Sequence, residues 1–174
     1  MHPLFQKATG LTETIIAAAI EVHRDKGPGL IESIYEWCLL KELGLRGLGC
    51  ISQRSVVINY KGFTREEPLR FDMLVEGCVL VEAKAVEKIL LIHKAQLLSY
   101  MKLLDVPLGL LINFHEMKVT DGISRLILPG ANRGNRVRNE ILCYLCSLLL
   151  IFKADAPIIP ESHRTDGNHH RCGH

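Results

Sequence analysis

The sequence predicts an α/β domain with the element order α-α-β-β-β-α-β, and three observations support this fold class. Apolar residues recur with helical spacing before residue 44 and again at 92–104. Between 55 and 84, apolar and polar residues alternate as they do in strands, and 107–114 is a short apolar strand suited to burial. The chain has 174 residues, of which 48% are hydrophobic and 23% charged, so it can form one globular domain with a sizeable core.

Two helices begin the predicted fold. The first contains an apolar stripe formed by Ile15, Ile16, Ala19 and Ile20. Thr12 is a preferred N-cap residue for this helix, and the Gly-Pro-Gly segment at 27–29 ends it. We expect the second helix at about 30–43, with Gly44 as its left-handed cap.

Three strands follow, at 55–60, 69–75 and 79–84. A Lys-Gly turn at 61–62 separates the first two. The second and third form a hairpin whose register follows from placing both apolar sets on one face. The expected pairs are Phe71 with Ala83, Met73 with Val81, and Val75 with Val79, and the connecting loop 76–78 has a glycine available for positive φ.

The opposite face of this hairpin gathers charged residues. The register places Asp72 across from Glu82, and Arg70 across from Lys84. Directly opposed side chains have Cβ atoms roughly 4.5–5.5 Å apart, so the two carboxylates repel and one pKa rises unless a cation lies between them. Carboxylates with a backbone carbonyl and water suit Mg²⁺ or Mn²⁺, and Lys84 could orient a bound water. Alternatively, this face is solvated and its charges form ordinary cross-strand pairs.

The spacing of Asp72, Glu82 and Lys84 resembles the signature of the PD-(D/E)xK nuclease superfamily. From the second helix onward, the predicted order αβββαβ matches the core of its restriction-endonuclease-like fold, here with an extra N-terminal helix. Within GLIESIY at 29–35, the residues Gly29, Glu32 and Tyr35 spell GxxExxY, and the segment resembles the bacterial family named after that motif. Three further segments resemble that family as well, namely VEAKAVEK, IHKAQLLSYMKLL and LGLLINF. The resemblance implies a nuclease-like domain at residues 11–128.

The resemblance also implies a function. It makes Asp72 and Glu82 metal ligands and Lys84 the catalytic lysine of a nuclease that hydrolyses phosphodiester bonds in DNA or RNA. With them, the backbone carbonyl of Ala83 would bind the Mg²⁺ or Mn²⁺ cofactor, and Glu32 would be a further acidic residue near the metal. The remaining site residues that we expect to contact substrate or order the site are Arg70, Gln96 and Tyr100, the last two matching a QxxxY pattern of the exonuclease-like branch.

Each supporting residue also has a structural alternative. Glu32 in the first turn of a helix favours the helix dipole without a metal. Tyr35 could be a core residue, Gln96 and Tyr100 partly buried amphipathic side chains, and His93 a helix cap. For the whole chain, the alternative is a catalytically silent module that binds nucleic acid or a protein partner. A weaker alternative is a hydrolase of a small phosphorylated compound.

The rest of the chain constrains location and partners. The net charge of +2 gives no global basic field, although a local basic patch can still bind nucleic acid. The N-terminus lacks the apolar run of a signal peptide, which predicts a cytoplasmic protein with free thiols. Residues 129–174 form an extension beyond the family pattern. Its apolar run at 141–152 is too short to span a bilayer and is expected to be a packed helix, and the tail from 157 is expected to be disordered. A zinc site involving the CxxC at 143–146 is the less favoured alternative to buried thiols.

Overall fold

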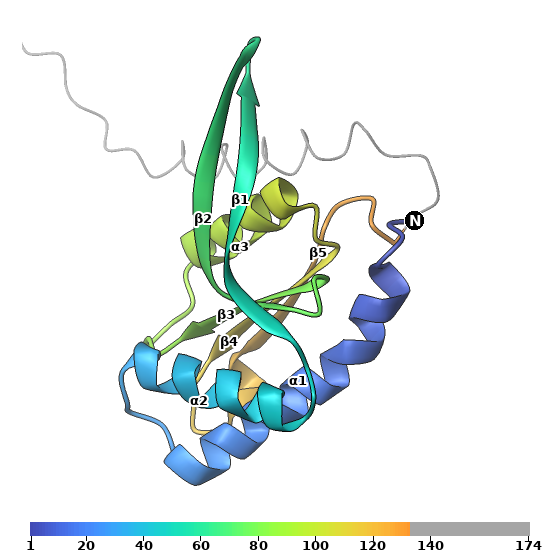
Figure 1. The fold of residues 1–174 in the computed structure, drawn as a ribbon. Helices are drawn as coiled ribbons and strands as arrows, with labels where there is room; N and C mark the ends of the chain where they lie inside the picture. Colours follow the sequence, from blue (N-terminus) through green and yellow to red (C-terminus); the bar gives the residue numbers. More distant parts are fainter. Residues whose placement is uncertain (133–174) are drawn as a thin grey trace, which may run out of the picture. The chain divides into compact units, whose positions relative to one another are not determined.

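The computed structural model describes residues 1–132 of the chain (Figure 1). The helix expected at 141–152, the CxxC at 143–146 and the tail from 157 lie outside these residues. The described elements follow the predicted order α-α-β-β-β-α-β and then add a short 3-10 helix and a strand that we did not include in it. They are α1 (Phe5–Lys26), α2 (Glu32–Leu45), β1 (Cys50–Tyr60), β2 (Phe63–Val75), β3 (Val79–Lys84), α3 (Leu91–Leu104), β4 (Leu108–Asn113), η1 (Val119–Gly122) and β5 (Ile123–Ile127).

Residues 1–132 contain a five-stranded sheet in the order β1-β2-β3-β4-β5. Neighbouring strands are antiparallel except β3 and β4, which are parallel and are joined by the crossover helix α3. All six residues of β3 and all six of β4 are buried, as expected for strands covered on both faces. Among the described residues, no helix is long and apolar enough to cross a membrane.

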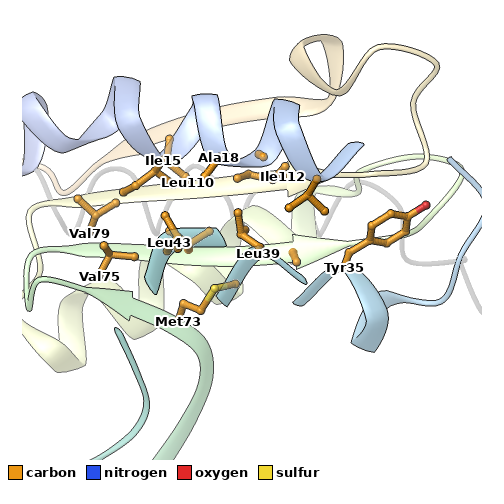
Figure 2. Packing of buried hydrophobic residues seen from close by; sticks show 14 of the residues in the cluster. Ile15, Ala18, Tyr35, Leu39, Leu43, Met73, Val75, Val79, Leu110 and Ile112 are labelled. Carbon is orange, nitrogen blue, oxygen red and sulfur yellow. The ribbon is translucent and has the colours of Figure 1, made fainter. Parts of the chain in front are cut away.

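Two apolar clusters hold the helices against the sheet. In the first, Ile15 and Ala18 of α1 and Leu39 and Leu43 of α2 pack over β2, β3 and β4, as Figure 2 shows. In the second, the buried side of α3 covers the opposite face of the sheet. Its members from α3 are Leu97, Met101 and Leu104. The central strand β3 therefore lies between two apolar layers.

The start of α1 and the end of α2 differ from those that we predicted. The first helix begins at Phe5 rather than after Thr12, and the Thr12 hydroxyl donates to the Ala8 carbonyl within the helix. Ala8 is fully buried, so packing extends the helix past the cap-like residue. Ile20 is 42% exposed, because the buried stripe continues through Ala18 and Val22 instead.

The second helix runs from Glu32 to Leu45 and does not end at Gly44. The left-handed glycine of this region is Gly47, with a φ of 74°. The amide of Leu48 then donates to the Leu43 carbonyl and closes the end of the helix. The prediction selected the first available glycine, whereas the chain uses the one that follows the last buried turn.

The motif residues Gly29 and Tyr35 shape the connection between α1 and α2. Gly29 has a φ of 100°, which favours glycine. Tyr35 is fully buried, and its ring stacks on Phe114 with centroids 4.6 Å apart. Its hydroxyl donates to the Gly27 carbonyl at 2.6 Å and accepts from the Leu30 amide at 3.1 Å. Tyr35 is thus a core residue that ties the loop to the helix.

The first two strands are longer than predicted and form a hairpin that extends beyond the sheet (Figure 1). The predicted turn is confirmed, with φ values of 48° at Lys61 and 89° at Gly62. Near its base, the β1–β2 register shifts between Ile51 and Gln53. Phe71, which we expected to share a face with Met73, instead packs in the cluster under α3. The change of face accompanies the point where β2 leaves β3.

Candidate active site

The β2–β3 hairpin that positions the candidate site has the predicted register at its closed end. Met73 pairs with Val81 and Val75 with Val79, and Gly77 in the loop has a φ of 68°. The ladder ends at Met73, so the pairs expected beyond it, including Asp72 with Glu82, are not formed as ladder pairs. The strands separate there because β2 continues into the hairpin with β1, where Arg70 pairs with Gln53 instead of Lys84.

Asp72 is held in place by the neighbouring strand although it has no ladder partner. Its Oδ2 accepts a hydrogen bond from the Ala83 amide at 2.8 Å. This bond places the Asp72 carboxylate at the backbone between Glu82 and Lys84. The carboxylates of Asp72 and Glu82 therefore both lie where β2 and β3 separate.

The charged face of β3 is buried, so the alternative of a solvated face with ordinary cross-strand pairs is wrong. Glu82 is 6% exposed and Lys84 is 9% exposed. Leu80, two residues before Glu82 on the same face, lies in the apolar cluster under α3. Alternation along the strand correctly groups these side chains, but it does not reveal that helices cover them.

Lys84 is the centre of the polar contacts. Its Nζ lies 3.0 Å from each of three oxygens: Glu82 Oε1, Glu32 Oε1 and the Ala83 carbonyl. Burial by itself would lower the pKa of the Lys84 ammonium. The hydrogen bond and charge of Glu82, the hydrogen bond of Glu32 and the charge of Asp72 outweigh burial and raise the pKa. Lys84 therefore remains a cation at neutral pH.

The carboxyl end of β3 is fixed by β4. Lys84 pairs with Asn113, and its carbonyl accepts from the Phe114 amide at 2.7 Å. The fully buried Asn113 side chain exchanges two hydrogen bonds with the backbone of Val86, at 2.8 and 3.1 Å. These bonds fix the chain after Lys84 against β4, so the lysine is held at a defined position.

Two observations show electrostatic strain around the carboxylates. Among residues 1–132, Glu82 Oε2 is the buried side-chain polar atom that has no hydrogen-bond partner. Burial, followed by the neighbouring charge of Glu82, raises the pKa of Asp72 from 3.8 to about 7, against the opposing effects of the Ala83 amide and Lys84. A buried carboxylate oxygen without a partner is costly unless a proton or a cation reaches it.

These residues fit a magnesium or manganese ion. Within the described part of the chain, no three Asp, Glu, His or Cys side chains converge as a complete ligand set. Mg²⁺ does not require one, because it commonly takes one or two carboxylates and keeps several waters. Asp72, Glu82 and the Ala83 carbonyl provide hard oxygen donors of the kind that these ions take, and among residues 1–132 no group satisfies Glu82 Oε2.

An open cleft of about 400 Å³ lies beside the carboxylates. Five of the residues selected from the sequence line it, namely Arg70, Asp72, Glu82, Gln96 and Tyr100. The Gln96 amide nitrogen donates to the Tyr100 hydroxyl at 3.4 Å. This bond connects two side chains that lie one turn apart on α3 and line the cleft. Glu32 is not among the lining residues and reaches the site through Lys84.

The lining of the cleft also does not include Ala83, Lys84, Tyr35 or His93. Tyr35 is fully occupied by its loop contacts, so its hydroxyl does not enter the cleft. His93 Nδ1 accepts from the Leu90 amide at 3.2 Å, which is the capping role that we preferred for it.

The sequence reasoning missed Glu36, a third carboxylate in the cleft. Burial, and then the charges of Glu32 and Glu82, raise the pKa of Glu36. Its spacing of four residues from Glu32 places both on one face of α2 and was a usable signal. Ser52 and Gln53 also line the cleft. They gave no signal, because the strand was expected to begin after them.

A family model and solved structures match this chain. The crystal structure of SSO0001 is similar at 20% sequence identity, over 74% of this chain and 61% of that one, with a TM-score of 0.43. The chain thus spans less than two thirds of that protein, and no curated protein matches it. The model of a nuclease family, described as the PD-(D/E)XK nuclease superfamily, matches residues 9–126. Because this match covers more than half of the chain, the protein belongs to the PD-(D/E)XK nuclease superfamily.

Proposed function

We propose that the protein is a nuclease that hydrolyses phosphodiester bonds in nucleic acid and depends on Mg²⁺ or Mn²⁺. The observation that carries the proposal is the buried group formed by Asp72, Glu82 and Lys84 at the edge of the cleft. Within the described residues, one oxygen of Glu82 has no hydrogen-bond partner, and the pKa of Asp72 is raised to about 7. Membership of the superfamily supports a nuclease-like activity.

In this proposal, Asp72, Glu82 and the Ala83 carbonyl hold the cation. When bound, the divalent ion supplies Lewis acidity toward the phosphate and lowers the pKa of water. Asp72 has to release its proton before it can bind, so binding strengthens as the pH rises toward 8. The Lys84 ammonium hydrogen-bonds the attacking water and stabilises the charge that develops on the phosphate.

The cleft wall provides the remaining roles. Arg70 is exposed and presents a guanidinium to the phosphate backbone. Gln96 and Tyr100 order the wall opposite and contact the same strand of nucleic acid. Glu36, whose pKa is raised, accepts a proton from water at the open side of the cleft.

A finer assignment within the superfamily is the GxxExxY group, with the nuclease-like domain at residues 11–128. Three observations support it. Gly29 occupies a conformation that favours glycine, Glu32 contacts the lysine of the site, and Tyr35 closes the loop before α2. The motif in this interpretation fixes the helix that delivers Glu32 and Glu36 to the site.

The test is cleavage of labelled single-stranded and duplex DNA and RNA with Mg²⁺, with Mn²⁺ and with EDTA. Glu82→Gln and Asp72→Asn preserve side-chain size, and we expect each to reduce cleavage at least 100-fold, since each removes a proposed ligand. Alanine is a poorer choice, because truncating one partner of a buried ion pair costs about 3–5 kcal/mol of stability.

Glu13→Gln is the matched control, since Glu13 lies on the exposed surface of α1, and it should cleave like the unaltered protein. Circular dichroism of every variant separates lost chemistry from lost folding. Undiminished cleavage by folded Glu82→Gln would contradict the site. Binding of nucleic acid without cleavage under any metal condition would favour the silent module instead.

A further inference from the structure

The hairpin of β1 and β2 carries an aromatic surface that the proposed cleavage site does not use. The two strands pair as far as Tyr60 and Phe63 at the tip and extend away from the helices (Figure 1). Tyr60 is 65% exposed and Phe63 is 77% exposed. Neither ring is buried within the domain, so both are available to contact another molecule.

Both rings lie on the face of the arm that packs against α3 near the base of the arm. Side chains alternate along a strand, so Tyr60 shares a face with Ile58 and Val56. Val56 is only 7% exposed and packs in the cluster under α3, which identifies this face. Phe63 is the direct cross-strand partner of Tyr60, and such pairs have Cβ atoms roughly 4.5–5.5 Å apart. The tip therefore presents two adjacent rings on the α3 side.

The charges around these rings favour an anionic ligand. The Lys61 ammonium lies 5.3 Å from the centre of the Tyr60 ring. Arg65 follows Phe63 on the same face, and Arg54 lies nearer the base. Within the described arm, the acidic residue on this face is Glu67, which is paired with Arg65 at 2.6 Å. Basic residues thus flank the rings, whereas the cores of protein interfaces are depleted of lysine and of acidic residues.

We propose that the aromatic arm, comprising Tyr60, Lys61, Phe63 and Arg65, binds unpaired nucleotides of the strand that enters the cleft. The rings stack on bases, which is independent of sequence because every base has a flat π face. The basic side chains contact the phosphates between those bases. This inference rests on the proposed function and adds to it a substrate with a single-stranded segment.

The length of the arm sets how far that segment must extend. Phe63 precedes Asp72 by nine residues on one strand, which corresponds to about 30 Å at roughly 3.3 Å per residue. A stacked strand rises about 3.4 Å per nucleotide, so roughly nine nucleotides separate the cleft from the rings. The arm therefore adds affinity for long strands and cannot do so for strands already confined to the cleft.

The experiment measures binding of fluorescent single strands of six and sixteen nucleotides in EDTA, which prevents metal-dependent cleavage. The double variant Tyr60→Thr, Phe63→Thr retains β-forming residues at both positions. Val57→Thr is the control, because Val57 is 60% exposed on the opposite face of the same strand. We expect the unaltered protein and the control to bind the longer strand at least tenfold more tightly than the shorter one, and the double variant to lose this gain.

An equal gain in the double variant would overturn the inference, and so would equally ring-dependent binding of a blunt duplex. A change in oligomeric state with unchanged binding, measured by light scattering, would identify the rings as a self-association surface and would also overturn it. Cleavage of the same strands in Mg²⁺ separates the two proposals. A protein that cleaves with ring-independent affinity refutes only the arm, whereas one that neither binds nor cleaves refutes the proposed function.

Discussion

Replacing Asp72 by asparagine tests the electrostatics of the cleft while preserving its shape. The asparagine Oδ1 can still accept the Ala83 amide hydrogen, so the contact between β2 and β3 remains. The substitution removes a carboxylate whose pKa is raised to about 7 by burial and by the charge of Glu82. We expect Asp72→Asn to stabilise the metal-free protein at pH 8 and to have no such effect near pH 4.

The sign follows from proton binding. Between about pH 4 and pH 7, Asp72 binds a proton in the folded protein but has lost it in the unfolded chain, so the free energy of unfolding falls as the pH rises through this window. A displacement of about three pKa units corresponds to at most about 4 kcal/mol. Asp72 is only half-buried, and solvent screening reduces this figure to roughly 1–2 kcal/mol, or about 2–8 °C in Tm.

Urea unfolding at pH 4.5 and pH 8, in EDTA, measures both free energies. Asp25→Asn is the control, because Asp25 is fully exposed and its pKa is lowered by the hydrogen bond and charge of Lys26, so no stabilisation is expected at pH 8. The same difference between Asp72→Asn and the unaltered protein at both pH values would refute the reasoning. So would a variant that is less stable at pH 8, since the carboxylate would then be favourably placed without a cation.

Two further predictions concern the packing around the site, each with a matched exposed control. Tyr35→Phe should lower the free energy of unfolding by about 1–2 kcal/mol, because it leaves a carbonyl and an amide of the loop 27–30 without their partner, whereas Tyr60→Phe should not change it. Equal urea midpoints for the two variants would show that the buried hydroxyl contributes nothing. Phe71→Asp places a charge in the cluster under α3 and should cost about 3–5 kcal/mol, enough to abolish cooperative unfolding, while Phe63→Asp at the exposed tip should melt normally. A cooperative melt of Phe71→Asp would contradict the assignment of Phe71 to the core.

The sequence predicted those parts of the fold that depend on alternation within one hairpin. The pairing of Met73 with Val81 followed from matching two apolar sets, and the tight loop followed from Gly77. The end of the ladder could not be predicted in the same way. The ladder ends where β2 pairs with β1 instead of β3. That pairing includes residues 63–68, where the apolar alternation is interrupted, so the sequence did not indicate a strand there.

Burial of the site was unpredictable for a related reason. Glu82 and Lys84 alternate with apolar residues, which is the pattern of a solvated face in a two-stranded hairpin. In the folded chain, β4 pairs with the other edge of β3, and helices cover both faces. These contacts are made by residues outside 69–84, so the spacing of residues within that segment cannot predict them. Glu36, by contrast, could have been predicted, because its spacing of four residues from Glu32 places both carboxylates on one face of α2.

The same burial explains why a cation would bind strongly where the free carboxylates are unfavourable. Glu82 Oε2 has no hydrogen-bond partner in the part of the chain that the structure describes, and burial raises the pKa of Asp72. In the metal-free domain, each carboxyl group therefore lacks a full set of favourable contacts. Lys84 compensates one oxygen of Glu82 but also contacts Glu32 and the Ala83 carbonyl, so a single ammonium serves three acceptors. Under the proposed function, Asp72 would release its proton and, together with Glu82 Oε2, would hold a divalent ion. The stability that the metal-free domain loses at these carboxylates is therefore recovered when the ion binds, and the gain should be largest above pH 7, where the folded protein no longer holds the competing proton.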